Sequence, residues 1–260
     1  MVKVLINGCN GKMGQEVANN IDNNENLLLI GGFDRENAGT CTFPVYTNFE
    51  QIEEKPDVII DFSVPVATLN ILDYASKENI AVVIATTGFT DEQNNIINNY
   101  SKKIPIFKSA NMSFDINIMS KLVSKLAVLL KGTDIEIIET HHNRKIDSPS
   151  GTAKLLADSI NTALGNTMEY EYNRHAKHEK RGKNEIGITS IRGGNIVGEH
   201  TVKFFGENET FEITHTSYSR SVFAEGALKA AEFIVEKPAG LYNMDNLINE
   251  EWIIYSFLIF

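Results

Sequence analysis

The sequence has only two cysteines, Cys9 and Cys41, and this scarcity excludes several classes of protein. Two widely separated cysteines provide neither a disulfide framework nor the paired spacing of a zinc site. Cys9 lies in a glycine-rich turn, where a small filler is a better interpretation than a reactive thiol. We therefore expect a chain that holds no metal and works in a reducing cytoplasm.

Positive charge is also scarce. Lys and Arg number 24 against 34 Asp and Glu, which gives a formal net charge of -10. A nucleic-acid binder needs a basic surface to meet phosphates, so no nucleic-acid partner is predicted. A small anionic ligand stays possible, because it needs only a local positive patch.

Long apolar runs are absent as well. The apolar run at the N-terminus is too short for a signal peptide and ends in turn residues. No stretch approaches the roughly 20 apolar residues of a membrane span, so no membrane association is expected. The apolar residues 252–260 are less than half that length and predict a segment that packs on the protein or on a neighbour.

The first hundred residues alternate two patterns. Short apolar runs indicate buried strands, and helical patterns separate several of them. This alternation predicts an α/β fold with a parallel sheet and helices on both faces. The expected strands are 4–7, 28–33, 58–62, 82–85 and 105–108, and the expected helices are 12–20, 66–77 and 91–102.

The second half changes texture near residue 110. Helical patterns at 116–130 and 149–163 flank a strand at 135–140, and three strands and a helix follow at 186–191, 196–204, 210–216 and 224–235. Pro149 is expected in the first turn of its helix, with Asp147 or Ser148 as the N-cap. This order predicts a second domain of the α+β class.

A glycine loop follows the first strand and leads directly into a helix. Gly11 and Gly14 fit the last two positions of a dinucleotide-binding G-x-G-x-x-G fingerprint, whereas the first glycine is displaced to Gly8. Asp34 ends the second strand, where an acid binds a ribose 2′-hydroxyl, and the next residue, Arg35, could meet a 2′-phosphate. The pair indicates a nicotinamide dinucleotide of either kind. The alternative is a strand–turn–helix whose glycines serve packing only.

The segment 141–145, His-His-Asn-Arg-Lys, concentrates positive charge in an acidic chain. A capped helix start follows it, and the positive end of a helix dipole favours an anion. A histidine or lysine beside a carboxylate-bearing substrate can supply the proton that a hydride addition requires. Adjacent residues on a strand face opposite ways, so spacing alone does not tell which residue is the acid. A solvated surface and a metal site are the alternatives, although adjacent histidines are poor metal ligands.

These segments resemble 4-hydroxy-tetrahydrodipicolinate reductase, also called dihydrodipicolinate reductase, a family of lysine and diaminopimelate synthesis in bacteria. The most specific match is the His-His-x-x-Lys-x-Asp-x-Pro-Ser-Gly-Thr element within residues 139–153. Segments 8–14, 85–89, 110–113 and 192–201 also match, and the resemblance extends to about Leu247. It implies a Rossmann-type N-terminal domain, residues 1–110 with a returning segment at about 236–260. The second domain, 111–235, would hold a mixed open sheet, bind the substrate and form a homotetramer.

The resemblance also implies an activity and its residues. The chain would reduce 4-hydroxy-tetrahydrodipicolinate to tetrahydrodipicolinate with hydride from NADH or NADPH. The resemblance does not indicate which of the two cofactors is preferred. His141 would be the proton donor and acceptor, and Lys145 a proton donor. The dicarboxylate substrate would contact His142, Ser150, Gly151 and Thr152. The cofactor would contact Gly8, Cys9, Asn10, Gly11, Lys12, Met13, Asp34, Arg35, Ala85, Thr86, Thr87, Ser109, Ala110, Asn111 and Met112.

Two features depart from the family pattern. Asp115 stands where the family usually has glycine, and residues 249–260 extend past the usual family end. Two other functions are alternatives to the reductase. A dehydrogenase of the aspartate-semialdehyde type needs a nucleophilic cysteine in the second half, where this chain has none. A dinucleotide-sensing regulator needs an interaction surface for DNA or for a partner, and the acidic balance and the lack of a DNA-binding pattern count against it.

Overall fold

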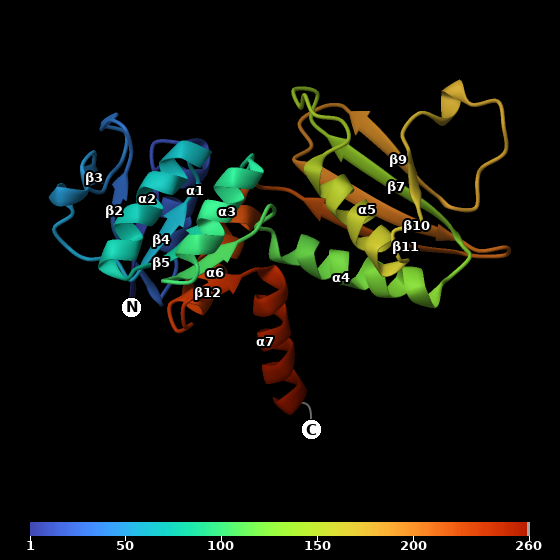
Figure 1. Ribbon diagram of the computed structural model, residues 1–260. Coiled ribbons are helices and arrows are strands. Elements are labelled where there is room, and N and C mark those ends of the chain that lie inside the picture. The colour runs from blue at the N-terminus through green and yellow to red at the C-terminus, as the bar shows by residue number, and fades with distance from the viewer. Residues whose placement is uncertain (259–260) are drawn as a thin grey trace. The chain divides into compact units, whose positions relative to one another are not determined.

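The computed structural model describes the backbone of residues 1–258 and the side chains of residues 1–251. It divides into two compact units (Figure 1). The first unit comprises Met1–Phe114 together with Arg220–Phe260, and the second unit is Asp115–Ser219. The chain therefore leaves the first unit and returns to it after completing the second.

The first unit contains a seven-stranded sheet in the order β12-β6-β5-β4-β1-β2-β3. Every strand pair in it is parallel. Strands β4 and β5 are buried along their whole length, as expected for a sheet covered on both faces. The strands are β1 (Val2–Asn7), β2 (Leu27–Phe33), β3 (Val45–Tyr46), β4 (Val58–Asp61), β5 (Ala81–Ile84), β6 (Pro105–Lys108) and β12 (Gly240–Tyr242).

Helices cover both faces of this sheet. Helix α1 (Lys12–Ile21) packs against α6 (Ser221–Ile234), which contacts β4, β5 and β6, while α2 (Pro65–Glu78) packs against α3 (Asp91–Tyr100). A 3-10 turn, η1, spans Phe49–Gln51. Helix α7 (Met244–Leu258) follows β12. The α/β prediction and its parallel sheet are thus confirmed.

The second unit is built on a five-stranded sheet in the order β11-β10-β7-β9-β8. β7 pairs antiparallel with β10 and parallel with β9, so the sheet is mixed. Helices α4 (Phe114–Leu129) and α5 (Gly151–Ala163) share one apolar core with the inner face of the sheet. The strands are β7 (Asp134–His141), β8 (Glu169–Glu171), β9 (Glu185–Arg192), β10 (Gly198–Phe205) and β11 (Thr210–Ser217), and η2 spans Arg174–Ala176.

Two details differ from the expectations. Helix α5 begins at Gly151, and its N-cap is Ser150, whose hydroxyl accepts a hydrogen bond from the Ala153 amide at 3.1 Å. The predicted caps, Asp147 and Ser148, are therefore wrong, because Ser150 satisfies the exposed amide and Pro149 lies before the helix. Helix α6, expected in the second domain, packs on the first sheet, since its many small buried residues allow close approach there.

Candidate active site

The glycine loop joins β1 to α1 through positions that tolerate no side chain. Gly8 has a φ of 82°, and a Cβ there would lie 2.6 Å from the carbonyl oxygen of Phe62. A Cβ at Gly14 would lie 2.3 Å from the Gly8 carbonyl oxygen. Helix α1 then begins at an N-cap, Gly11, that offers no side-chain hydrogen bond. Its first amides and its positive dipole end are suited to an anion such as a pyrophosphate.

A cavity of about 510 Å³ opens beside this loop, at the carboxyl ends of β1, β2 and β4. Ligands of parallel α/β sheets bind at these ends. The residues that follow β4 also line the cavity, because β4 neighbours β1, and they were not predicted from the sequence. The available signal was their position directly after a buried apolar strand. The predicted residues in the lining are Gly8, Asn10, Gly11, Asp34 and Arg35, and Phe62, Ser63, Val64, Ala67 and Asn70 join them.

The other predicted members of the loop do not line this cavity. Lys12 is exposed and Met13 is half-buried at the start of α1. Cys9 is fully buried against Gly32, where an added Cβ would lie 2.5 Å from the sulfur. Burial raises the pKa of the Cys9 thiol to about 12, so the thiol stays protonated and acts as the small filler expected.

Asp34 links the end of β2 to the glycine loop. One carboxylate oxygen accepts a hydrogen bond from the Asn10 amide at 3.0 Å, and the other accepts one from the Arg35 amide at 2.8 Å. The Asn10 side chain in turn donates to the carbonyl of Glu36 at 2.8 Å. These bonds hold the acid at the edge of the cavity.

A second cavity of about 190 Å³ lies where β5 and β6 end. Of the predicted residues, Thr86, Thr87, Ser109 and Ala110 line it. Lys108, which sequence analysis missed, also lines it, with its ammonium 5.1 Å from the ring centre of Phe89. Burial lowers the pKa of Lys108. The remaining predictions, Ala85, Asn111 and Met112, lie outside this lining.

The fully buried carboxylate of Asp61 ties these loops together. It accepts hydrogen bonds from Asn7 at 2.7 Å, from Ser63 at 2.5 Å and from Thr68 at 2.6 Å. The Ser63 amide donates to the Thr86 hydroxyl at 2.9 Å. One hydrogen-bond network thus connects the ends of β1, β4 and β5 beside the two cavities.

In the second unit, the predicted catalytic histidine stands at the end of a strand. His141 is the last residue of β7 and is 8% exposed, and His142 follows after the strand has ended. The His142 amide donates to the Ile196 carbonyl at 2.8 Å, and its buried Nδ1 has no hydrogen-bond partner among the described residues. The two histidines therefore have different surroundings, because His141 ends the strand and His142 lies beyond it.

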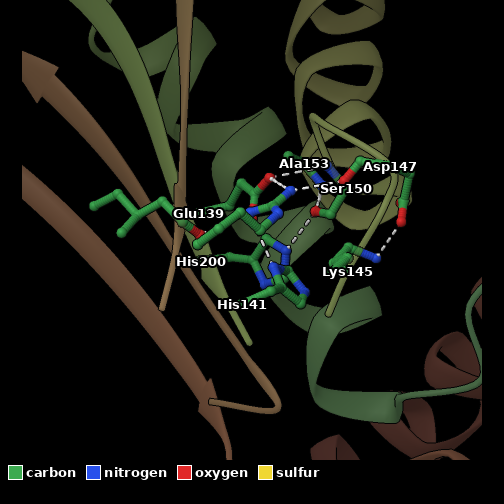
Figure 2. A network of polar contacts seen from close by, with 9 residues as sticks. Glu139, His141, Lys145, Asp147, Ser150, Ala153 and His200 are labelled. Atoms are coloured by element: carbon green, nitrogen blue, oxygen red, sulfur yellow. Dashed lines mark hydrogen bonds and ion pairs between the residues drawn. The ribbon is translucent and has the colours of Figure 1, made fainter. Parts of the chain in front are cut away.

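A carboxylate that sequence analysis missed holds His141 (Figure 2). Glu139 is fully buried, and its Oε2 lies 2.6 Å from His141 Nδ1. Arg192 donates to both carboxylate oxygens at 2.7 Å, and the Ser150 amide donates to Oε1 at 3.0 Å. Burial acts to raise the pKa of Glu139, but these donors outweigh it and lower the pKa to about 2. The period of two along β7 was the available signal, because it places Glu139 on the face of His141.

Lys145, the second predicted catalytic residue, follows a turn in which its amide donates to the His142 carbonyl at 3.1 Å. Its ammonium forms an ion pair with Asp147 Oδ1 at 2.9 Å, which Figure 2 shows. The hydrogen bond from Lys145 lowers the pKa of Asp147. The lysine side chain is 21% exposed, so the ammonium is held in place and still reaches the surface.

The predicted substrate-binding residues lie at the start of α5. Ser150 is buried, with its hydroxyl 2.9 Å from Nε2 of His200, while a Cβ at Gly151 would meet no other atom. His200 packs its ring edge-to-face on His141 at 5.1 Å. Burial and the neighbouring His141 lower the pKa of His200 to about 3. His200 is therefore a neutral support beneath the site.

This arrangement can bind an anion and exchange a proton. A helix start and the Lys145 ammonium lie beside the imidazole of His141 on the second unit (Figure 2), and His142 adds a buried ring nitrogen with no hydrogen-bond partner among the described residues. Burial lowers the pKa of His141, although Glu139 acts to raise it. The first unit supplies glycine-lined cavities of the kind that hold dinucleotides.

Comparisons with known proteins decide the family. Residues 2–112 match the model of the dihydrodipicolinate reductase N-terminus, and residues 115–248 match that of its C-terminus. The chain belongs to the dihydrodipicolinate reductase family. The resemblance expected from the sequence is therefore confirmed, and with it the assignment of the chain as an oxidoreductase of lysine and diaminopimelate synthesis.

Individual relatives agree with this assignment. The 4-hydroxy-tetrahydrodipicolinate reductase of Caldanaerobacter subterraneus is 48% identical over 96% of this chain and 99% of its own length. That of Clostridium tetani is 46% identical over 96% of this chain and 98% of its own length. A dipicolinate-bound dihydrodipicolinate reductase from Paenisporosarcina superposes with a TM-score of 0.77 at 29% identity, covering 94% of this chain and 97% of that one. No helix in the described part of the chain is long and apolar enough to cross a membrane.

Proposed function

We propose that this reductase assigns one half of its reaction to each unit. The first unit binds NADH or NADPH, and the second binds 4-hydroxy-tetrahydrodipicolinate and supplies the proton for its reduction to tetrahydrodipicolinate. The observation that carries the proposal is the cluster formed by Glu139, His141 and Lys145 beside the start of α5. It combines a proton-exchanging imidazole, an ammonium and an anion-binding helix end on the matched family segment.

The cavities of the first unit fit a nicotinamide dinucleotide. The start of α1, which has no side-chain cap, suits the pyrophosphate. The carboxylate of Asp34 suits a ribose with a free 2′-hydroxyl, and the exposed Arg35 suits a ribose with a 2′-phosphate. Thr87 and Ser109 line the cavity where β5 and β6 end, which suits the nicotinamide end. When bound, the cofactor supplies a hydride.

The start of α5 fits a carboxylate of the substrate. The positive dipole end at Gly151 and Thr152 attracts an anion, and the partnerless Nδ1 of His142 provides a further polar contact. The Paenisporosarcina relative was solved with dipicolinate, a dicarboxylate of the same ring type. The overall reaction consumes the hydride and one proton and releases the 4-hydroxyl group of the substrate as water. Lys145 and His141 supply that proton, acting as general acids toward the electron-rich atom.

The working form is a homotetramer in the cytoplasm. The helices α4 and α5 cover one face of the second sheet, and the opposite face carries Ile191, which is 48% exposed, and paired threonines such as Thr201 and Thr214. A sheet face of this composition is suited to pairing with a second copy. Light scattering after gel filtration checks the assembly, and a monomer at micromolar concentration would contradict it.

A nicotinamide absorbance assay tests the reaction. Purified chain is mixed with freshly generated substrate and with NADH or NADPH in turn. Substrate-dependent oxidation of either cofactor is the expected result, and the two rates give the cofactor preference. Cofactor binding without oxidation would refute the assignment of the substrate while leaving the role of the first unit intact.

A further inference from the structure

The two oxygens of Glu139 are occupied by donors alone. Arg192 contributes one N–H to each oxygen at 2.7 Å, and the Ser150 amide donates to Oε1. A fully buried carboxylate with this set of partners is ionised, because each bond favours the charged form. The Ser190 hydroxyl is a further hydrogen-bond partner of this carboxylate, and Nδ1 of His141, 2.6 Å from Oε2, must then be a donor too.

The tautomer of His141 follows from this bond. A neutral imidazole carries one N–H, and Glu139 requires it at Nδ1, so Nε2 carries the lone pair. No hydrogen bond to Nε2 exists within the described residues. Gly198 lies beside this nitrogen, and a Cβ there would lie only 3.1 Å from Nε2. The ring thus presents a single open nitrogen for proton exchange.

We propose that Glu139 and Arg192 are positioning residues of the reductase, which together hold His141 as the Nδ1–H tautomer with Nε2 directed at the substrate. This inference rests on the proposed function of His141. The register of the sheet explains the pairing, because His141 and Arg192 are partners on the parallel strands β7 and β9. Neither residue of the pair needs to contact the substrate, and both act through the imidazole.

The two charges act on His141 in opposite directions. The carboxylate favours the imidazolium, whereas the guanidinium disfavours it, and the ammonium of Lys145 acts in the same direction as Arg192. The pair therefore orients the ring while its net charge is zero. A carboxylate alone would orient the ring but would also hold the proton, which a proton donor has to release.

Two variants with opposite signs test the proposal. Glu139→Gln removes the negative charge and is expected to lower the pH at which His141 titrates. Arg192→Gln removes the positive charge and is expected to raise that pH. The midpoints are measured by NMR on the full chain with ¹⁵N-labelled histidine, and in the pH profile of kcat/KM. A residue that served packing alone would not shift the two variants in opposite directions.

The same spectra report the tautomer. We expect a pyrrole-type Nδ1 and a pyridine-type Nε2 for His141 in the parent chain, and loss of this preference in Glu139→Gln. Turnover in that variant should fall about 10- to 100-fold, the usual effect of removing an outer partner of a functional histidine. Arg192→Lys keeps the positive charge, so His141 should titrate at the same pH as in the parent chain. Together with Arg192→Gln, it tests the effect of the charge even if the buried Glu139→Gln variant does not fold.

Glu136→Gln is the matched control. Glu136 lies on the same strand and pairs with an arginine, Arg181, at 3.1 Å, but makes no contact with His141. It should leave the tautomer, the midpoint and turnover unchanged. An Nε2–H tautomer in the parent chain, or shifts of the same sign in both glutamine variants, would overturn the proposal. Normal turnover in His141→Gln with the expected tautomer would instead refute the proposed role of His141.

Discussion

Mild acid should destabilise the second unit through one buried side chain, His200. This histidine is 4% exposed, and its Nε2 lies 2.9 Å from the Ser150 hydroxyl, as Figure 2 shows. Burial lowers its pKa to about 3, from 6.5 in the unfolded chain. Below pH 6.5 the unfolded state binds a proton that the folded state refuses. Stability is therefore full above pH 6.5 and is lost as the pH falls toward 3.

The size of the effect follows from these values. Because the folded pKa lies well below 5, the loss between pH 7 and pH 5 depends almost only on the unfolded value, and it amounts to about 2 kcal/mol from His200 alone. For a domain of this size that loss corresponds to a fall in Tm of roughly 8 °C. Urea unfolding followed by circular dichroism at the two pH values measures it.

A variant isolates the contribution of His200. His200→Gln offers a neutral side chain to Ser150 and has nothing to titrate, so its stability should change by about 2 kcal/mol less between pH 7 and pH 5. His178→Gln, at an exposed histidine, is the control and should behave like the parent chain. An NMR titration of His200 with a midpoint near 6.5, or an unchanged pH dependence in His200→Gln, would refute the reasoning.

Further variants test the assigned site. Lys145→Ala and His141→Gln should each lower kcat by about 10²-fold or more, the scale of general acid catalysis, with NADH binding by fluorescence titration unchanged; near-normal turnover in both would remove their roles. Asp34→Ala should raise the Kd of NADH more than that of NADPH, because the acid serves a free 2′-hydroxyl, and equal effects would contradict this. Gly198→Ala places a methyl group against His141 Nε2 and should lower kcat while leaving circular dichroism unchanged; parent-like kcat would show that Nε2 is not the reacting atom.

Local patterns made the first unit predictable. Buried strands such as β4 and β5 alternate with helices, so periodicity and turn residues locate both, and the parallel sheet follows from this alternation. The short edge strands β3 and β12 were harder, because two or three residues carry no period. The domain to which helix α6 belongs could not be predicted either, because an amphipathic pattern indicates that a helix packs on a sheet but does not indicate on which sheet.

The site was predictable to the extent that it lies on one segment. His141 and Lys145 are four positions apart, and their chemistry can be inferred from the residues between β7 and α5. Arg192 could not be inferred in this way, because it meets Glu139 only through the register of two parallel strands that are far apart in the sequence. The alternation of β7 places Glu139 and His141 on one face, yet it does not reveal that the carboxylate is charged.

That charge is a property of the assembled sheet and decides what the histidine can do. A protonated Glu139 could donate a hydrogen bond as well as accept one. It would therefore not require an N–H at Nδ1 of His141, and either neutral tautomer of the imidazole could form. The two bonds from Arg192 remove this freedom, because they stabilise the charged form of a fully buried carboxylate. The sequence element thus indicates the residues that we propose for proton exchange, and in this proposal the long-range pairing of β7 with β9 determines which nitrogen of His141 is open.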